Sequence, residues 1–161
     1  MESFLTELNR FLCKATLSTY AGGGPEADFV QGFTELEYDE GEWAYKDSYT
    51  GFFRSWGRET IWHRGKPFWT QLYGGGMAAK FHSNKEFALK TFEFLRKALS
   101  CGEKRKAFQP RGPKKFSSGT WKYICNWNGT ISKFEGSEKI LFKRDVVFTH
   151  AFLGGLILPE K

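Results

Sequence analysis

Apolar residues recur with a helical period in two parts of the chain. Near the start they fall at positions 4, 5, 8, 11, 12 and 15, which is the spacing of a helix with one buried face. Near the middle, Ser83 is followed three residues later by Glu86, as in a capping box, and apolar positions continue from Phe87 to Ala98. The pattern predicts one helix at each place, the second beginning at Ser83 and ending near Gly102.

The segment after each helix alternates between large and small or polar residues, as strands do when one face of a sheet is buried. One face of a first strand would carry Trp43, Tyr45, Asp47 and Tyr49. One face of a second strand would carry Trp121, Tyr123, Cys125 and Trp127. The dipeptides Thr50-Gly51 and Asn128-Gly129 have the composition of hairpin turns at corresponding places. We therefore expect a meander of four short antiparallel strands after each helix.

The two halves of the chain match each other position by position. Corresponding pairs are Gly41 and Gly119, Trp43 and Trp121, Gly57 and Gly136, Glu59 and Glu138, Ile61 and Ile140, and Tyr73 and Phe152. A chance similarity would not reproduce the helix pattern and the strand pattern in the same order. The sequence thus predicts a single α+β domain over residues 1–161, built by tandem duplication of a helix plus a four-stranded antiparallel meander. The two repeats, about 1–80 and 81–158, would be related by a pseudo-twofold axis.

Rings rather than branched aliphatic side chains supply most of the material for a core. Aromatic residues make up 18% of the chain, with 17 Phe, 6 Trp and 6 Tyr, and rings pack well on a pleated sheet. The rings of the paired strands either pack beneath the helices as core or line a concave cavity where the halves meet, and the sequence leaves both open. The candidate ligand-binding residues are Trp43, Tyr45, Tyr49, Glu59, Trp69, Tyr73, Trp121, Tyr123, Trp127 and Glu138.

Glu59 and Glu138 stand at equivalent positions, two residues before Ile61 and Ile140. A carboxylate among apolar neighbours must be hydrogen-bonded or paired, because an unpaired buried charge costs several kcal/mol. Each Glu then either holds its own repeat together or faces a cleft, where it would attract a cation or act as an acid or base. Two facing carboxylates are also the minimum for hydrolysis of a glycosidic or ester bond.

The chain is basic, with a net charge of +6, which makes nucleic acid a possible partner. Cations gather in the loop after the second helix: Lys104, Arg105, Lys106, Arg111, Lys114 and Lys115. Prolines at positions 110 and 113 interrupt this loop, so we expect it at the surface. It is either an ordinary solvated loop or a contact for nucleic acid that is independent of base sequence and sensitive to salt.

Other signatures of chemistry are missing from the sequence. The chain has three cysteines, Cys13, Cys101 and Cys125, and their spacing is not that of metal ligands. We therefore expect no disulfide framework and no metal site, and a cytoplasmic location. The longest apolar run, from Ala151 to Leu158, is far shorter than the ~20 residues that span a bilayer, and the acidic N-terminal segment is not a signal peptide. No nucleophile elbow, zinc-protease motif, phosphate loop or dinucleotide fingerprint is present, so no cofactor is expected.

Parts of the sequence resemble known families. The run TYAGGG at residues 19–24 and the later DSYTG at residues 47–51 resemble the signature of an uncharacterised prokaryotic family of small domains of unknown function. The resemblance covers about residues 10–76. Members of that family sometimes follow a helix-turn-helix domain; this sequence shows none, so the resemblance implies no direct reading of DNA.

The predicted architecture carries a second, looser resemblance. Tandem helix-and-sheet repeats about a pseudo-twofold axis are similar to the drug-sensing effector domains of the gyrase-inhibitor type. Those domains hold small, often cationic ligands between their halves with aromatic residues and a Glu. The resemblance is one of fold alone, and fold does not determine function.

These features together predict non-enzymatic binding of a small aromatic or cationic molecule between the halves. The first alternative is a module that binds nucleic acid or a regulatory partner through residues 104–115. The second is a hydrolase that uses Glu59 and Glu138. No membrane association is expected.

Overall fold

The computed structural model describes residues 2–23, 27–30, 32–101 and 107–158. Helix α1 (Glu2–Ser18) comes first, followed by strands β1 (Ala27–Val30), β2 (Phe33–Glu40), β3 (Trp43–Gly51), β4 (Arg54–His63) and β5 (Lys66–Met77). A short 3-10 helix, η1 (Ala79–Phe81), leads to helix α2 (Lys85–Ser100) and strands β6 (Lys115–Ser118), β7 (Trp121–Thr130), β8 (Lys133–Phe142) and β9 (Asp145–Leu156). The prediction of an α+β fold with an antiparallel sheet is confirmed.

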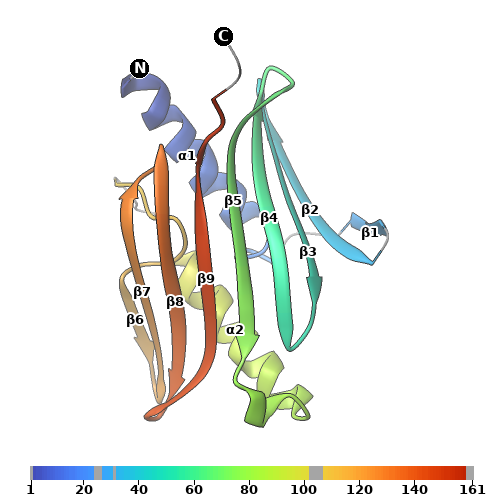
Figure 1. The fold of residues 1–161 in the computed structure, drawn as a ribbon, viewed down its shortest axis with the longest axis vertical. Helices are drawn as coiled ribbons and strands as arrows, with labels where there is room; N and C mark the ends of the chain where they lie inside the picture. The colour runs from blue at the N-terminus through green and yellow to red at the C-terminus, as the bar shows by residue number, and fades with distance from the viewer. Residues whose placement is uncertain (1, 24–26, 31, 102–106, 159–161) are drawn as a thin grey trace.

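The nine strands of the described residues form one sheet in the order β1-β2-β3-β4-β5-β9-β8-β7-β6. The chain makes two meanders, which join where β5 pairs with β9, from Trp69 opposite Leu156 to Met77 opposite Phe148. Both helices lie on the same face of the sheet, behind it in Figure 1, and their C-terminal ends approach each other near the middle of the molecule. A cavity between the helix ends and the sheet would therefore touch both meanders.

Local details differ from the sequence pattern at three places. Helix α2 is capped by Asn84, whose Oδ1 accepts a hydrogen bond from the amide of Phe87 at 3.0 Å, so the predicted start at Ser83 is wrong. Asn128 and Gly129 pair with β8 inside strand β7, and the chain turns only after that strand ends. Strand β1 adds a fifth strand to the first meander.

Rings from helices and strands pack against each other on the helix-covered face. Trp43 of β3 stacks on Phe11 of α1 with ring centroids 5.7 Å apart. In the second meander, Trp121 of β7 stacks on Phe94 of α2 at 5.5 Å. Each helix is thus held on the meander that follows it by an aromatic pair, in which Trp43 belongs to the core and Trp121 is partly buried against it.

Trp69 joins the two meanders, and its substitution tests the core between them. Its side chain is fully buried, stacks on Phe134 with centroids 5.7 Å apart, and donates through Nε1 to the carbonyl of Ile131 at 3.0 Å. Trp69→Phe should lower the free energy of unfolding by about 2–4 kcal/mol, because a buried carbonyl loses its donor and the core loses volume. Chemical denaturation measures the change.

Trp56 on the neighbouring strand β4 provides the matched control. Its side chain is 61% exposed, so Trp56→Phe should change the free energy of unfolding by no more than about 0.5 kcal/mol. Equal losses at the two positions would contradict the placement of Trp69 at the join.

Candidate functional site

A buried ion group lies at the centre of the helix-covered face of the sheet. Arg111, from the loop before β6, donates through Nη1 to Oε1 of Glu59 on β4 at 2.9 Å. Its Nε donates to Oε1 of Glu138 on β8 at 3.1 Å. The exposed fractions of the Arg111, Glu59 and Glu138 side chains are 8%, 7% and 0%. One guanidinium thus bridges two carboxylates that belong to different meanders.

Further hydrogen bonds surround Glu138. Its Oε2 accepts from the hydroxyl of Tyr123 at 2.6 Å, and its Oε1 lies 3.2 Å from Nδ1 of His150. The Tyr123 hydroxyl accepts in turn from the amide of Gly112 at 3.0 Å, which fixes the loop that carries the guanidinium. These bonds satisfy a charge whose burial would otherwise cost several kcal/mol.

A second carboxyl stands beside Glu59. Asp47 of β3 is its direct cross-strand partner, and both residues are buried, with 3% and 5% of their surface exposed. Asp47 Oδ1 accepts from the hydroxyl of Tyr73 at 2.8 Å, and Glu59 Oε1 accepts from Nε2 of Gln71 at 3.2 Å. Two carboxyl groups therefore face each other across β3 and β4, at one side of the ion group.

The three carboxyls differ in their affinity for protons. Burial alone would raise the pKa of Glu138, but the guanidinium and the neighbouring hydrogen-bond donors outweigh it and lower the pKa to about 2. For Glu59, burial prevails over the same guanidinium and raises the pKa. Burial, and next the charge of Glu59, raise the pKa of Asp47 from 3.8 to about 8. Near neutral pH Glu138 is ionised, whereas the Asp47–Glu59 pair retains a proton.

A cavity of about 450 Å³ lies between this acidic pair and the helices. Its sheet side includes Tyr45, Asp47, Tyr49, Glu59, Tyr73 and His150, and Arg111 reaches it from the loop. Its helix side includes Thr16 and Thr19 near the end of α1 and Leu95, Arg96 and Leu99 near the end of α2. The cavity combines apolar and aromatic walls with a few converging polar groups, which is typical of sites for small molecules.

The structure separates the predicted ligand-binding residues into three groups. Those that line the cavity are Tyr45, Tyr49, Glu59 and Tyr73. Those that are buried or packed elsewhere in the core are Trp43, Trp69, Trp121, Tyr123 and Glu138. Trp127 lines a different depression. Tyr45 and Tyr73 are also buried members of the core, so these two rings belong to both the core and the cavity wall.

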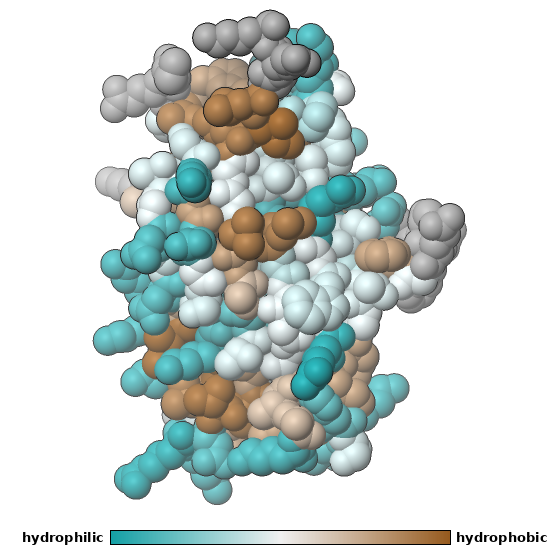
Figure 2. Space-filling model, viewed as in Figure 1, coloured by the Kyte–Doolittle hydropathy of each residue, from teal (hydrophilic) through white to brown (hydrophobic). Residues whose placement is uncertain are grey.

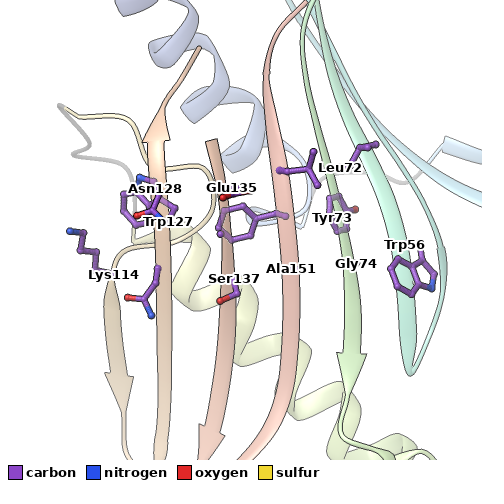
Figure 3. A pocket seen from close by; sticks show the side chains of 14 residues that line it. Trp56, Leu72, Tyr73, Gly74, Lys114, Trp127, Asn128, Glu135, Ser137 and Ala151 are labelled. Atoms are coloured by element: carbon purple, nitrogen blue, oxygen red, sulfur yellow. The ribbon is translucent and has the colours of Figure 1, made fainter. Parts of the chain in front are cut away.

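The depression that includes Trp127 is a shallow groove of about 900 Å³ on the helix-free side of the sheet. Figure 3 shows it crossing the sheet from Trp56 on β4 to β7. Leu72, in its wall, is 48% exposed, and Figure 2 shows hydrophobic patches among hydrophilic residues on this side of the molecule. The charged residues of its lining, Lys114 and Glu135, are exposed. The groove therefore offers a ligand no buried charge, and we take the inner cavity as the candidate site.

The basic loop after α2 is only partly at the surface. Lys104, Arg105 and Lys106 lie outside the described residues. The expectation that Arg111 lies in a surface loop is wrong, because two buried carboxylates hold its guanidinium inside the protein. Lys114 lies 5.5 Å from the ring centroid of Trp127, and Lys115 is exposed on β6. One cation of the predicted nucleic-acid contact, Arg111, is thus paired inside the protein and does not face solvent.

The described part of the chain contains neither a metal cluster nor a membrane-spanning helix. No cluster of His, Cys, Asp and Glu there has the arrangement needed to hold a metal ion. No described helix is long and apolar enough to cross a membrane.

Fold and site together define the class of protein: two helices on one face of a continuous antiparallel sheet, with a charged cavity between them. A family model described as a domain of unknown function (DUF5680) matches residues 47–157. The match covers more than half of the chain, so the protein belongs to this family, and the predicted membership of an uncharacterised domain family is confirmed. Comparisons with curated proteins and with solved structures gave no match. The matched segment contains the whole ion group and its acidic neighbour, Asp47.

Sequence reasoning overlooked Asp47 as a site residue, and it assigned Arg111 to a nucleic-acid contact rather than to the cavity. Asp47 stands on the same strand face as Tyr45 and Tyr49, so a carboxyl among rings is the signal that identifies it. Arg111 lies in an irregular loop between prolines, where no periodicity indicates which way a side chain points.

His150 was also overlooked, because its position depends on an irregularity in the sheet. A shift of register between Ile140 and Leu141 places Glu138 opposite His150. If the register that pairs Phe142 with Asp145 extended unchanged along the two strands, Glu138 would lie opposite Thr149. No local pattern in the sequence predicts the shift.

Removal of the bridging guanidinium should destabilise the protein strongly. Arg111→Met leaves Glu59 and Glu138 buried without their cation, which should cost about 3–5 kcal/mol of unfolding free energy near neutral pH. Both carboxyls must then bind protons to remain buried, so their folded pKa values rise above the unfolded ones. The loss should therefore be small near pH ~5 and grow as pH rises towards ~8. Denaturation curves across this range measure it.

Arg10→Met is the matched control for that substitution. Arg10 pairs with Glu40 at 3.1 Å, but its side chain is 53% exposed, and exposed pairs contribute only about 0–1 kcal/mol. A loss for Arg111→Met that is equally small, or that does not vary with pH, would show that the ion group does not stabilise the fold.

Proposed function

We propose that the protein binds a small cationic, partly aromatic molecule in the inner cavity, with Asp47 and Glu59 as its counter-ions. The observation that carries this proposal is the surplus of acid on the sheet side of the cavity, where Asp47 and Glu59 lie, whereas Arg96 lines the helix side. Arg111 already bonds to Glu138 as well as to Glu59, and the pKa values of Asp47 and Glu59 are both raised, chiefly by burial. The protein's own cations therefore do not neutralise this pair, and a bound cation would.

The end of helix α1 adds to the attraction for a cation. Thr16 and Thr19 near the end of α1, and Leu99 near the end of α2, line the cavity. The C-terminus of a helix carries a partial negative charge, and a cation in its last turn is stabilised by about 0.3–1 kcal/mol. The last turn of α1 contains no basic residue of its own. The last turn of α2 contains Lys97, and Arg96 lines the cavity from that helix, so it is the end of α1 that favours positive charge in the cavity.

The aromatic walls suit an organic cation rather than a metal ion. Tyr45, Tyr49 and Tyr73 line the cavity from the sheet, and Phe92 lines it from α2. The guanidinium carbon of Arg111 already lies 4.7 Å from the ring centroid of Tyr73, so these rings accept a cation on their face. A cation–π contact of a desolvated cation contributes about 2 kcal/mol. The charge and the rings together support a ligand such as a substituted ammonium or an aromatic amine.

We further infer that the two meanders with their helices arose by duplication of one unit. In support, Glu59 pairs with Asp47 in the first meander, and Glu138 pairs with Cys125 at the equivalent place in the second. One glutamate of the two is thus paired with a carboxyl and the other with a thiol. The surplus of acid would then be a specialisation of the first copy, and the ligand would contact that copy's strands.

The cysteines agree with a reducing environment, and we retain the cytoplasm as the predicted location. Cys13, Cys101 and Cys125 form no disulfide within the described residues. An effector of this type would bind a ligand that reaches or is made in the cytoplasm. A change of fold stability on binding would be its simplest output, since a ligand stabilises the state that binds it.

Substitution of Glu59 tests the proposed counter-ion. With benzyltrimethylammonium as the probe, Glu59→Gln should raise the Kd at least about tenfold, because the acidic pair loses a charge. The melting temperature should change little, since the amide oxygen still accepts from the Arg111 guanidinium. Isothermal titration calorimetry and thermal unfolding measure the two effects.

Glu138→Gln is the matched control, because Glu138 lies in the same ion group and is fully buried. It should lower the melting temperature and leave the Kd of the same probe within about twofold. Equal losses of stability at both positions, with unchanged affinity, would show that Glu59 too serves the fold alone.

The pH dependence of binding provides an independent test. Asp47 has a pKa of about 8 in the folded protein, so below pH 8 a cation must displace a proton, and affinity should rise as pH increases from about 6 to about 9. The stability of the ligand-free protein should show the opposite trend. A carboxyl whose folded pKa is raised stabilises the fold fully below its unfolded pKa of 3.8 and loses that contribution as pH rises through about 8. Asp47→Asn should weaken both trends, and identical profiles for the two proteins would contradict the assignment.

A further inference from the structure

Three side chains at the cavity form a chain of hydroxyl, imidazole and carboxylate. The Oγ of Ser55 lies 3.5 Å from Nε2 of His150. The Nδ1 of the same imidazole lies 3.2 Å from Oε1 of Glu138. This is the order of groups in which a base activates a nucleophile and an acid orients the base. Both Ser55 and His150 line the inner cavity, so a bound molecule can reach the hydroxyl.

The sheet itself brings these side chains into one row. Ser55 on β4 pairs with Gly75 on β5, Gly75 pairs with His150 on β9, and His150 pairs with Glu138 on β8. Strands lie about 4.8 Å apart, so Ser55 and His150 are separated by the width of a whole strand. Their side chains must reach across β5 to meet.

Gly75 leaves that path open. Its φ is 141°, in a region that favours glycine. A Cβ atom at this position would lie 2.2 Å from the carbonyl oxygen of Thr149 and 3.1 Å from Cδ2 of His150. The absence of a side chain between the two strands is thus a condition for the contact between hydroxyl and imidazole.

The protonation states suit proton transfer from the hydroxyl. Burial lowers the pKa of His150, despite the opposing hydrogen bond to Glu138, so the imidazole is neutral at physiological pH. Glu138 is ionised and can only accept. The Nδ1 of the imidazole therefore carries the proton, and the lone pair of Nε2 faces Ser55.

Neighbouring rings hold the imidazole in place. The centroid of His150 lies 4.4 Å from that of Phe148 and 5.6 Å from that of Tyr73. Packing of this kind limits the rotation of the imidazole and so keeps the base aligned with its nucleophile. The same Tyr73 bonds to Asp47, so the hydroxyl–imidazole pair and the acidic pair share one aromatic wall.

We propose that Ser55, His150 and Glu138 hydrolyse a carboxylic ester whose alcohol part carries an organic cation. Ser55 Oγ bonds to the carbonyl carbon while His150 Nε2 takes the hydroxyl proton. The tetrahedral intermediate then breaks its bond to the alcohol, which leaves with that proton, and an acyl-serine remains. Water repeats the two steps, so the carboxylic acid is released and the hydroxyl of Ser55 is restored. Glu138 acts as a positioning residue through His150.

The position of the acidic pair determines the shape of this substrate. Ser55 and Glu59 lie on the same face of β4, four residues apart, which is about 13 Å between Cα atoms. If the ester carbonyl contacts Ser55 and the cation contacts Glu59, the cation must lie several bonds away from the carbonyl, as in a choline ester. The choice of a cationic alcohol rests on the proposed function, whereas the acyl-transfer step rests on the hydroxyl, imidazole and carboxylate alone.

Covalent labelling of the full chain tests the nucleophile without any cation. A neutral alkyl fluorophosphonate should add to Ser55 Oγ with loss of fluoride, as detected by intact mass and peptide mapping. Ser55→Ala should abolish the label, and Ser137→Ala, on the helix-free face of β8, should leave it unchanged. Glu138→Gln should slow labelling and alter its pH profile, because the imidazole loses the carboxylate that fixes its tautomer. A chain that is folded but is not labelled at Ser55 overturns the proposal.

Hydrolysis of benzoylcholine, compared with the neutral ester in which carbon replaces its quaternary nitrogen, tests the substrate. The wild-type chain should prefer the cationic ester at least about tenfold in kcat/KM, and Ser55→Ala should lower kcat/KM at least about a thousandfold. Hydrolysis without that preference would support the triad and overturn the proposed cation site. Binding of benzyltrimethylammonium without hydrolysis or labelling would support the cation site and overturn the triad.

Discussion

The contact of Arg111 with two carboxylates from different meanders is the interaction on which the rest of the structure depends. Because Glu59 belongs to β4 and Glu138 to β8, the guanidinium ties the halves together on the face that the helices cover. It also neutralises only part of the acid that it meets. A buried ion group of this kind contributes little net stability compared with apolar packing, and its value lies in fixing one arrangement. Here the fixed arrangement is a cavity whose wall is acidic on one side.

The two meanders contribute different groups to the candidate site. Residues near the C-terminal ends of both helices line the cavity, and both meanders contribute a glutamate to the ion group. Asp47 has Cys125 in its place in the second meander, and Ser55 and His150 come from different meanders. A ligand would therefore meet counter-ions on one side and the hydroxyl–imidazole pair where the halves join.

Much of the fold could be predicted from the sequence, because helical and strand periods are local. The ring-bearing face of β3, from Trp43 to Tyr49, is correctly indicated by alternation alone. Tyr45 and Tyr49 line the cavity and Trp43 does not, and the position of the helices above them makes this difference. That depends on contacts between distant segments, and no local pattern records it.

The candidate site was less predictable for the same reason. The unusual burial of Glu59 and Glu138 follows from their apolar neighbours, and both are buried. Arg111, which donates hydrogen bonds to both glutamates, lies in an irregular loop. The position of His150 opposite Glu138 depends on a shift of register between β8 and β9. Charged groups can be recognised singly in a sequence, whereas their pairing is a property of the folded chain.

The charge state of Asp47 is the quantity that tests this account most directly. Its side-chain carboxyl carbon can be followed by NMR through a pH titration, with Asp47→Asn to assign the resonance. The account predicts titration near pH 8 in the free protein, and a clear fall in that pKa when benzyltrimethylammonium is bound, because a cation stabilises the ionised carboxyl. A titration near pH ~4 that the cation does not alter would contradict it.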